Sequence, residues 1–287
     1  MSDPVNHHYL PIFYLKAWAG PDGRVFRYYR PQKGVVISPI APSNTAYEPS
    51  LYSLENCAPK ERQRIEREFM GPAVDEPASI VAAALRSDRV HEVGHKGKCD
   101  WARFLISLLV RNPEKISDLQ KSGRAQVEES LRLEPQEYDA IKSHEDPPTL
   151  SEWVEKNVPF YLKNAGKIVL PSLIDNPNIG NELLQFRWFI SRFPNSRFSL
   201  LTSDRPLVMT TGLRRDGCIV ALPLAPRLAF FATREKALID NVLAKAGESG
   251  LVRALNESVA SQAYKHVYGS DQTQLNFVEK RLRAFGG

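Results

Sequence analysis

Two adjacent histidines near the N-terminus, His7 and His8, lie in the segment HHYLPIFYLKAW. A neutral imidazole acts as a general base or as a metal ligand near neutral pH. Side chains of adjacent residues on an extended chain point to opposite faces, so at most one of the two histidines faces a given site. We take His8 as the candidate catalytic residue. The structural alternative is a capping or buried histidine that only makes hydrogen bonds.

A second polar motif, TSDRP at residues 202–206, stands at the end of a predicted strand. Turns at strand ends are places where a rigid scaffold presents polar side chains. Ser203 and Asp204 are therefore candidate catalytic residues, and Asp204 is suited to bind a cation or to orient a histidine. The alternative is ordinary turn chemistry, in which an aspartate accepts hydrogen bonds from nearby backbone N–H groups.

Arg111 begins a third motif, RNP, at the end of an apolar helix predicted over residues 100–111. An arginine there binds an anion or, in the simpler interpretation, complements the negative end of the helix dipole. Among the alternating charges of residues 60–69, Glu66 is the carboxylate expected to point inward. The other charges of that helix are expected to pair with one another on a solvated face.

Two asparagines complete the candidate set as binding residues. Asn44 lies in the proline-rich loop 41–50, where it lines a cleft or simply forms a turn. Asn256 lies within a long helix near the C-terminus, where an amide lowers helix propensity unless it makes a hydrogen bond.

The elements that position these residues change type along the chain. The segments 24–30 and 35–40, separated by a turn containing Pro and Gly, predict a hairpin. Helical patterns follow at 60–71, 77–88, 100–111, 114–129, 135–143, from Thr149 or Ser151 onward and at 181–193; β-prone runs at 197–202, 207–210, 218–222 and 227–232; and further helices at 234–245, 248–268 and 271–283.

Because these strands and helices are segregated rather than alternating, we expect an α+β fold. We expect the N-terminal hairpin and the 197–232 strands to form one mixed, mainly antiparallel sheet. Residues 60–193 then form a large helical insertion, further helices follow at the C-terminal end, and residues 1–287 make a single domain.

The chain has 287 residues, with 38 Lys and Arg against 33 Asp and Glu, which gives a net charge of +5. This mild excess permits an anionic partner without requiring one, because strong phosphate binding needs clustered charge. The cations that remain as candidates for phosphate contact are Arg111, those of the strand 24–30, Arg214 and Arg215. The aromatic side chains of that strand could stack on bases, although a half-buried strand explains them more simply.

Several classes of protein are disfavoured. The chain has no GxxxxGK motif, no GxGxxG, no GxSxG and no HExxH, which argues against P-loop motors, Rossmann dehydrogenases, α/β-hydrolases and zincins. Three widely spaced cysteines without zinc spacing indicate reduced thiols in a cytoplasmic protein. The N-terminal segment lacks the pattern of a signal peptide, and no apolar stretch approaches the ~20 residues that a membrane span needs.

The motifs occur in a recognisable order. HHYLPIFYLKAW is followed by RNP, FSLLTSDRPLV, LPLAPRLAFF and NESVASQAYKHVYGS. The chain resembles the bacterial domain-of-unknown-function family 4238, through His-x-x-Pro-x-x-Tyr-Leu at His8, Pro11, Tyr14 and Leu15, and through Thr-Ser-Asp-x-Pro at Thr202, Ser203, Asp204 and Pro206. The resemblance covers nearly the whole chain and implies one domain. It implies no established activity, but it strengthens the case for His8, Arg111, Ser203, Asp204 and Asn256.

Two functional hypotheses follow. The first is a phosphodiester-cleaving nuclease of a defence or toxin type. In it His8 is the general base or a metal ligand, Asp204 binds a divalent cation or orients His8, and Arg111 neutralises charge on the phosphate. It requires these three residues to converge in one pocket.

The second hypothesis is a non-catalytic binding or sensor module for a small anionic ligand or a partner protein. The same polar residues then form a structural network that fixes the junction between sheet and helices. The identity of the substrate, the metal and the oligomeric state are left open by the sequence.

Overall fold

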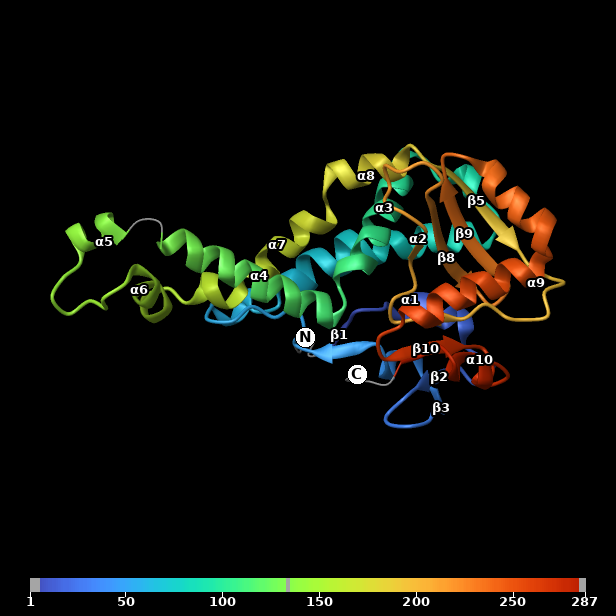
Figure 1. Cartoon of the computed structure of the whole chain (residues 1–287), viewed down its shortest axis with the longest axis horizontal. Coiled ribbons are helices and arrows are strands. Elements are labelled where there is room, and N and C mark those ends of the chain that lie inside the picture. The colour runs from blue at the N-terminus through green and yellow to red at the C-terminus, as the bar shows by residue number, and fades with distance from the viewer. Residues whose placement is uncertain (1–5, 133–134, 284–287) are drawn as a thin grey trace.

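The computed structural model describes residues 6–132 and 135–283, and within them three antiparallel sheets are surrounded by helices (Figure 1). The strands are β1 (Asn6–His8), β2 (Val25–Tyr29), β3 (Val36–Ile40), β4 (Tyr47–Pro49), β5 (Arg187–Arg192), β6 (Thr202–Ser203), β7 (Val208–Met209), β8 (Ile219–Ala225), β9 (Leu228–Thr233) and β10 (His266–Gly269). The expected α+β class is confirmed.

Within the described residues, helices connect many of these strands. They are α1 (Ile12–Leu15), the π-helix Ile65–Asp75, α2 (Glu76–Arg86), α3 (His95–Val110), α4 (Pro113–Arg132), α5 (Pro135–Ile141), α6 (Leu150–Asn157), α7 (Phe160–Ile174), α8 (Pro177–Leu184), α9 (Lys236–Gln262) and α10 (Leu275–Glu279), with short 3-10 turns at Lys16–Trp18, Pro42–Asn44, Pro59–Glu61 and Val90–Glu92. None of these helices is both long enough and apolar enough to cross a bilayer.

The expectation of one shared sheet is wrong. The hairpin β2–β3 joins β10 and β6 in the order β3-β2-β10-β6, whereas β7, β8 and β9 form a separate sheet in the order β5-β9-β8-β7. A third, two-stranded sheet pairs β1 with β4. The separation arises because two strands that the sequence analysis placed in helices, β5 and β10, supply the missing neighbours.

Both misassigned strands follow a helix that ends early. The predicted helix 181–193 stops at Leu184, and the run RWFISR that follows pairs with β9 as β5. The predicted helix 248–268 likewise stops at Gln262, and His266–Gly269 pairs with β2 and β6. In both segments aromatic and β-branched residues favour the strand once neighbours are available. Of the predicted strand 197–202, only the last residue is extended and paired.

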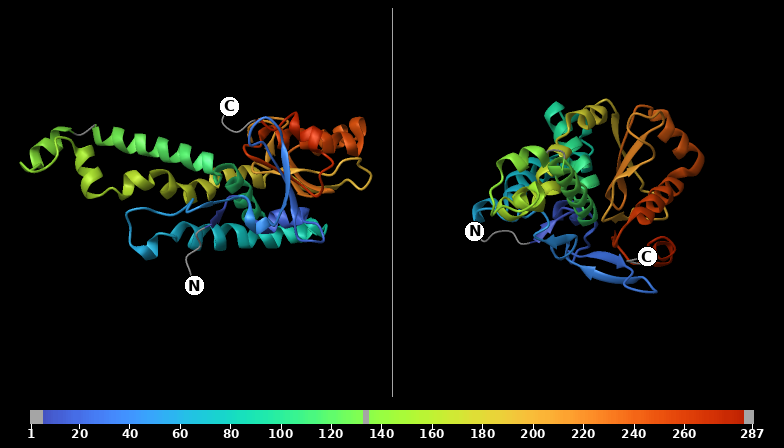
Figure 2. Two further views of the ribbon diagram at one scale, coloured as in Figure 1. Left: turned by 90° about the horizontal axis from the view of Figure 1, so that it is seen from below. Right: turned by 60° about the vertical axis from the view of Figure 1, so that its left-hand side comes forward.

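The larger sheet is packed on both faces. Along β8 and β9 alternate residues point to opposite sides, so Leu222 and Phe230 face one core and Ala221 and Phe231 face another. Helices α2 and α3 cover the first face and α9 covers the second (Figures 1 and 2). Within α9, Gly247 has a positive φ of 64°, which marks the break predicted between two C-terminal helices.

The π-helix replaces a predicted helix end. The sequence Gly71-Pro72 was expected to stop the helix that begins near Lys60, yet the described chain continues through both residues into α2. Proline breaks an α-helix because it has no N–H to donate and its ring clashes with the preceding turn. The wider winding, whose hydrogen bonds span five residues, carries the chain past Pro72.

Helices α4 and α7 form an arm that extends away from the sheets, with α5 and α6 at its far end (Figures 1 and 2). Two glycines allow the two helices to approach very closely. A Cβ placed on Gly166 would lie 2.3 Å from the backbone nitrogen of Gln120, and one on Gly123 would lie 3.0 Å from the Cβ of Ala165. The side chain of Gln120 bonds the opposite backbone at Leu162 and Gly166, which fixes the register of the arm.

Gly166→Ala should therefore lower the free energy of unfolding by about 2–3 kcal/mol, because the new methyl group meets backbone rather than a flexible side chain. Chemical denaturation measures this. Gly180→Ala in α8 is the matched control, since a Cβ there meets nothing within 4 Å and should be neutral or stabilising. Equal effects of the two substitutions would contradict the close crossing.

Candidate functional site

The guanidinium of Arg111 lies at the centre of a buried polar group beside β1. Arg111 is 1% exposed, and its Nη1 and Nη2 donate to the two carboxylate oxygens of Asp75 at 2.6 and 2.9 Å. Nη2 also donates to the backbone carbonyl of His8 at 2.8 Å. Burial alone would lower the pKa of Arg111, but the Asp75 carboxylate raises it above its ordinary value. Arg111 therefore positions β1, and its charge is already balanced by Asp75.

The carboxylates of this group depend on the π winding. Glu66 and Asp75 stand nine residues apart. An α-helix turns by about 100° per residue, which would put the two side chains on opposite faces. A π-helix bonds residues five apart and turns by about 80° per residue, so the same spacing makes about two full turns. Both carboxylates consequently act on Arg111, and Glu66 points inward as the sequence indicated.

Two titratable side chains near Arg111 have shifted pKa values. Burial raises the pKa of Glu66 to about 7; Arg111 opposes the shift and Asp75 adds to it. The Oε2 of Glu66 is buried and has no hydrogen-bond partner among the described residues. Burial lowers the pKa of His8, against the raising effect of the backbone carbonyl of Ser43, which lies 3.3 Å from Nε2. Arg111 and Asp75 thus act both on a carboxyl with a raised pKa and on an imidazole with a lowered one.

The two histidines of β1 have different environments. His7 is fully buried, stacks on Tyr52 and accepts a hydrogen bond at Nδ1 from the Tyr52 backbone N–H. His8 is partly exposed and lies beside the ring of Tyr47. The alternation expected of an extended segment is therefore present, and His8 is the histidine that can meet a substrate.

Asp204 lies in a different environment from His8. Its carboxylate accepts hydrogen bonds from three successive backbone N–H groups, those of Tyr264, Lys265 and His266, at 2.9, 2.6 and 2.9 Å. Burial raises the pKa of Asp204 to about 6 despite these bonds. Ser203 is also buried, and its Oγ accepts from the backbone N–H of Arg205. This is the turn chemistry given above as the structural alternative, and it fastens the TSDRP turn to the start of β10.

Tyr9 separates the two polar groups. It follows His8 in the chain, is buried, and has its pKa raised by burial and then by the hydroxyl of Tyr268 and the carboxylate of Asp204. Among the described residues no hydrogen bond or ion pair joins Asp204 to His8 or Arg111. The structure therefore brings His8 and Arg111 together and holds Asp204 in a separate polar group.

The two candidate asparagines also lie apart from each other. Asn256 is 1% exposed; its amide accepts from the N–H of Leu201 and donates to the carbonyl of Ser199 and to Gln274. It joins α9 to the chain leading into β6, which is a structural role. Asn44 is exposed in the turn that also contains Ser43, the residue contacted by His8.

A cavity of about 260 Å³ lies where the RNP and TSDRP motifs meet. We call it the Asn112–Arg205 cavity, and its lining residues are Leu108, Leu109, Asn112, Lys115, Arg205, Leu207 and Gln262. Asn112 caps α4, because its Oδ1 accepts from the N–H of Lys115 at 3.0 Å. Gln262 donates from Nε2 to the backbone carbonyl of Leu207 at 3.0 Å and so holds the turn that carries Arg205.

The polar groups of this cavity are partly unused. Asn112 is 4% exposed, and no described residue accepts a hydrogen bond from its amide nitrogen. The guanidinium of Arg205 lies 3.6 Å from a carboxylate oxygen of Glu114 and over the ring of Tyr264, while its Nε is buried without a partner in the described part of the chain. The sequence analysis did not select Asn112 or Arg205. Each stands one residue after a selected one, so the motifs were the signal and only the position within them was missed.

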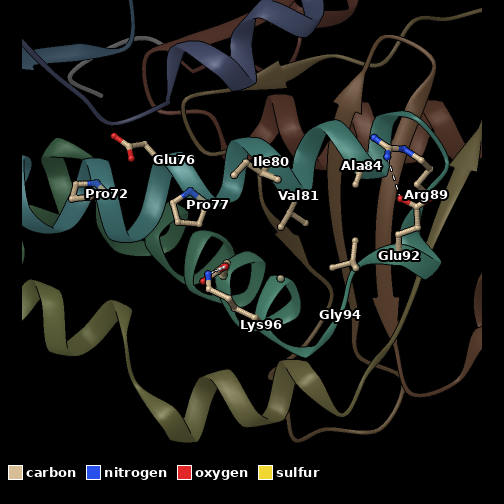
Figure 3. A pocket seen from close by; sticks show the side chains of 13 residues that line it. Pro72, Glu76, Pro77, Ile80, Val81, Ala84, Arg89, Glu92, Gly94 and Lys96 are labelled. Carbon is tan, nitrogen blue, oxygen red and sulfur yellow. Dashed lines mark hydrogen bonds and ion pairs between the residues drawn. The ribbon is translucent and has the colours of Figure 1, made fainter.

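A larger cavity of about 600 Å³ lies between α2 and the start of α3 (Figure 3). Four of its five charged lining residues pair with each other, Arg89 with Glu92 at 3.1 Å and Lys96 with Asp100 at 2.7 Å, and the fifth is Glu76. None of the residues selected from the sequence lines it. In the described part of the chain no group of three or more His, Cys, Asp or Glu side chains is arranged to hold a metal ion.

The sequence that forms these polar groups matches the model of a protein family. A family model described as "Protein of unknown function (DUF4238)" matches residues 6–273, a span that includes every residue of both polar groups and the cavity. The chain therefore belongs to the DUF4238 family, as the order of its motifs indicated. No curated protein and no solved structure matches the chain.

The raised pKa of Glu66 predicts a pH-dependent stability. The pKa of Glu66 is 4.5 in the unfolded chain and about 7 in the folded one. Between these values the unfolded state has lost a proton that the folded state keeps, so this group makes the free energy of unfolding fall as pH rises. Glu66→Gln should therefore stabilise the protein more at pH 8 than at pH 5, as measured by urea unfolding.

Glu68→Gln is the matched control for this experiment, because the Glu68 side chain is 58% exposed on the same helix. It should change stability little and similarly at both pH values. A gain for Glu66→Gln that is the same at pH 5 and pH 8 would contradict the raised pKa.

Proposed function

We propose that the protein binds a small anionic ligand in the Asn112–Arg205 cavity. The observation that carries the proposal is the meeting of two motifs about 90 residues apart in sequence across one cavity, each contributing a polar side chain with unused hydrogen-bonding capacity. Arg111 and Asp204, the neighbours of Asn112 and Arg205 in the chain, fix the two motifs through Asp75 and through backbone N–H groups, and neither lines the cavity.

The electrostatics of the cavity favour an anion. Arg205 and Lys115 line it, and no carboxylate is among its described lining residues. Lys115 pairs only with Asp118 at 3.8 Å between two side chains that are more than half exposed, which leaves its charge largely available. The N-terminus of α4 also faces this region, since Asn112 is its cap, and a helix N-terminus attracts negative charge.

The size and the apolar wall of the cavity restrict the ligand. About 260 Å³ is below the usual range for drug-sized ligands, which favours a small metabolite. Leu108, Leu109 and Leu207 supply the apolar part of the lining. A phosphate or carboxylate joined to a small apolar or ring-shaped part fits both features.

Titration calorimetry with inorganic phosphate, pyrophosphate, adenosine monophosphate and citrate tests this proposal. We expect at least one of these probes to bind and to raise Tm, because a ligand that binds only the folded state stabilises it. Arg205→Gln and Lys115→Gln should each weaken binding about tenfold, since a hydrogen bond to a charged group contributes about 1.5–3 kcal/mol.

Lys121→Gln is the control, because it makes the same charge change at an exposed position of the same helix. It should bind like the unmodified protein. Equal weakening by Lys121→Gln, or no binding of any probe, would overturn the proposal.

A second candidate function is phosphodiester cleavage at His8, with a divalent cation as a possible cofactor. The specific observation in its favour is the pair of shifted groups, a neutral His8 and a Glu66 that keeps its proton until about pH 7, since a catalytic acid and base need pKa values near the working pH. In this scheme Arg111 positions His8 through its backbone carbonyl. Neither Arg111 nor Asp204 contacts the phosphate.

Purified protein incubated with RNA and DNA, with and without Mg²⁺ or Mn²⁺, tests the second candidate. Cleavage should fall as pH rises above about 7, because Glu66 loses its proton there. His8→Ala should abolish it, whereas His91→Ala, at a side chain 75% exposed, should not. No cleavage by the unmodified protein, or equal rates for both variants, would exclude this activity.

A further inference from the structure

The β2–β3 hairpin, residues 24–40, contains four cations and no Asp or Glu. Arg24, Arg27 and Lys33 form no ion pair with any described carboxylate. Arg64, at the start of the π-helix, by contrast pairs with Glu68. The hairpin therefore holds a local excess of positive charge.

Arg30 completes the hairpin in a structural role. Its guanidinium donates to the backbone carbonyls of Lys33, Glu279 and Leu282, which ties the hairpin to the end of α10. This contact holds the turn in place. Arg24, Arg27 and Lys33 are thus presented from a fixed hairpin rather than from a loose loop.

One face of the sheet β3-β2-β10-β6 is closed by helices. Tyr28 and Val267 on this face are buried in a core shared with the end of α9 and with α10. The pairing of His266 with Tyr29, and of Tyr268 with Arg27, puts these four side chains on the opposite face. Arg27, Tyr29 and His266 are only partly buried there, and Val36, the partner of Tyr29 on β3, is 42% exposed.

The open part of this face combines an aromatic ring, an arginine and a neutral imidazole. The guanidinium of Arg27 lies 4.7 Å from the centroid of the Tyr29 ring, and the His266 ring meets Tyr29 edge to face at 6.3 Å. Nε of Arg27 and Nδ1 of His266 have no hydrogen-bond partner within residues 6–132 and 135–283. Burial, followed by Arg27 and Lys265, lowers the pKa of His266 to about 4, so its imidazole is neutral at pH 7.

We propose that the surface formed by Arg27, Tyr29 and His266 on this face, together with Arg24 just before β2 and Lys33 in the turn after it, binds single-stranded nucleic acid. Arg24, Arg27 and Lys33 contact phosphates of the strand, and an unpaired base stacks on the Arg27–Tyr29 pair. Arginine planes and aromatic rings on an open sheet are the usual platforms for unpaired bases. A duplex keeps its bases stacked on each other, so only a single strand uses the aromatic part of the surface.

This surface is separate from the Asn112–Arg205 cavity, because the two have no residue in common. The inference does not rest on ligand binding in the cavity or on cleavage at His8. Each of the three can fail without the others.

Fluorescence anisotropy with labelled 20-nucleotide oligo-U and oligo-dT tests the proposal in the full-length protein. Three phosphate contacts to a single strand give a slope of about −2 in log K against log salt, so affinity should fall about 20-fold between 50 and 200 mM salt. Arg24→Gln and Lys33→Gln should each reduce the size of that slope by about 0.7. Comparing oligo-U with oligo-dT shows whether RNA or DNA is preferred.

The stacking contact has its own test. Tyr29→Leu should weaken binding about tenfold, whereas Tyr29→Phe, which keeps the ring, should bind like the unmodified protein. Thermal unfolding of each variant shows whether the sheet is intact. If Tyr29→Leu unfolds the protein, the comparison of Lys33→Gln with Arg64→Gln tests nucleic-acid binding instead.

Arg64→Gln is the control for charge, because it removes an exposed cation that is already paired on a helix. It should leave affinity and salt slope unchanged. The proposal is overturned if Arg64→Gln weakens binding as much as Lys33→Gln, if duplex DNA or heparin binds as tightly as the single strands, or if no oligonucleotide binds at 50 mM salt.

Discussion

The buried ion pair between Arg111 and Asp75 joins three segments that are distant in sequence. It links the end of α3 to the end of the π-helix, and through the carbonyl of His8 it holds β1 between them. Removing one partner of such a pair leaves an uncompensated charge in the interior, at a cost of about 3–5 kcal/mol. Because Asn112 follows Arg111 directly, the same pair sets the start of α4 and one wall of the Asn112–Arg205 cavity. Both candidate functions therefore depend on an arginine that touches no ligand in either of them.

Local chemistry was readable from the sequence, whereas long-range pairing was not. Asp204 was recognised as a possible turn aspartate, and its three bonds to backbone N–H groups have that character. Glu66 was identified as the inward carboxylate because it stands beside Ile65. The strand β10 was missed because HVYG follows a strong helical pattern, and only pairing with β2 makes it extended. The α+β class survived this error because segregation of elements does not depend on one strand.

The predicted site failed in part for a similar reason. His8, Arg111 and Asp204 were grouped because each is polar at the end of an element, but sequence gives no information on what already satisfies a side chain. The structure shows that Asp75 neutralises Arg111 and that backbone N–H groups bond to Asp204, whereas the residues beside them line the Asn112–Arg205 cavity. The net charge of +5 is also a poor guide to binding when it is taken from the sequence alone. Its significance depends on which cations lack an acidic partner, and that is a property of the fold.

The π-helix Ile65–Asp75 also makes the chain length between two carboxylates a structural requirement. Each residue added to or removed from a helix rotates everything beyond it by about 100°. Each hydrogen bond of the π-helix joins residues five apart rather than four apart. Asp75 therefore reaches Arg111 only when the number of residues between Glu66 and Asp75 is kept. Within this segment, substitutions that preserve packing are compatible with the fold. A one-residue insertion or deletion, in contrast, would turn Asp75 away from Arg111 and so disturb the contact that holds β1. The number of residues between Glu66 and Asp75 is thus a structural constraint on this chain in its own right, distinct from the identity of any one of them.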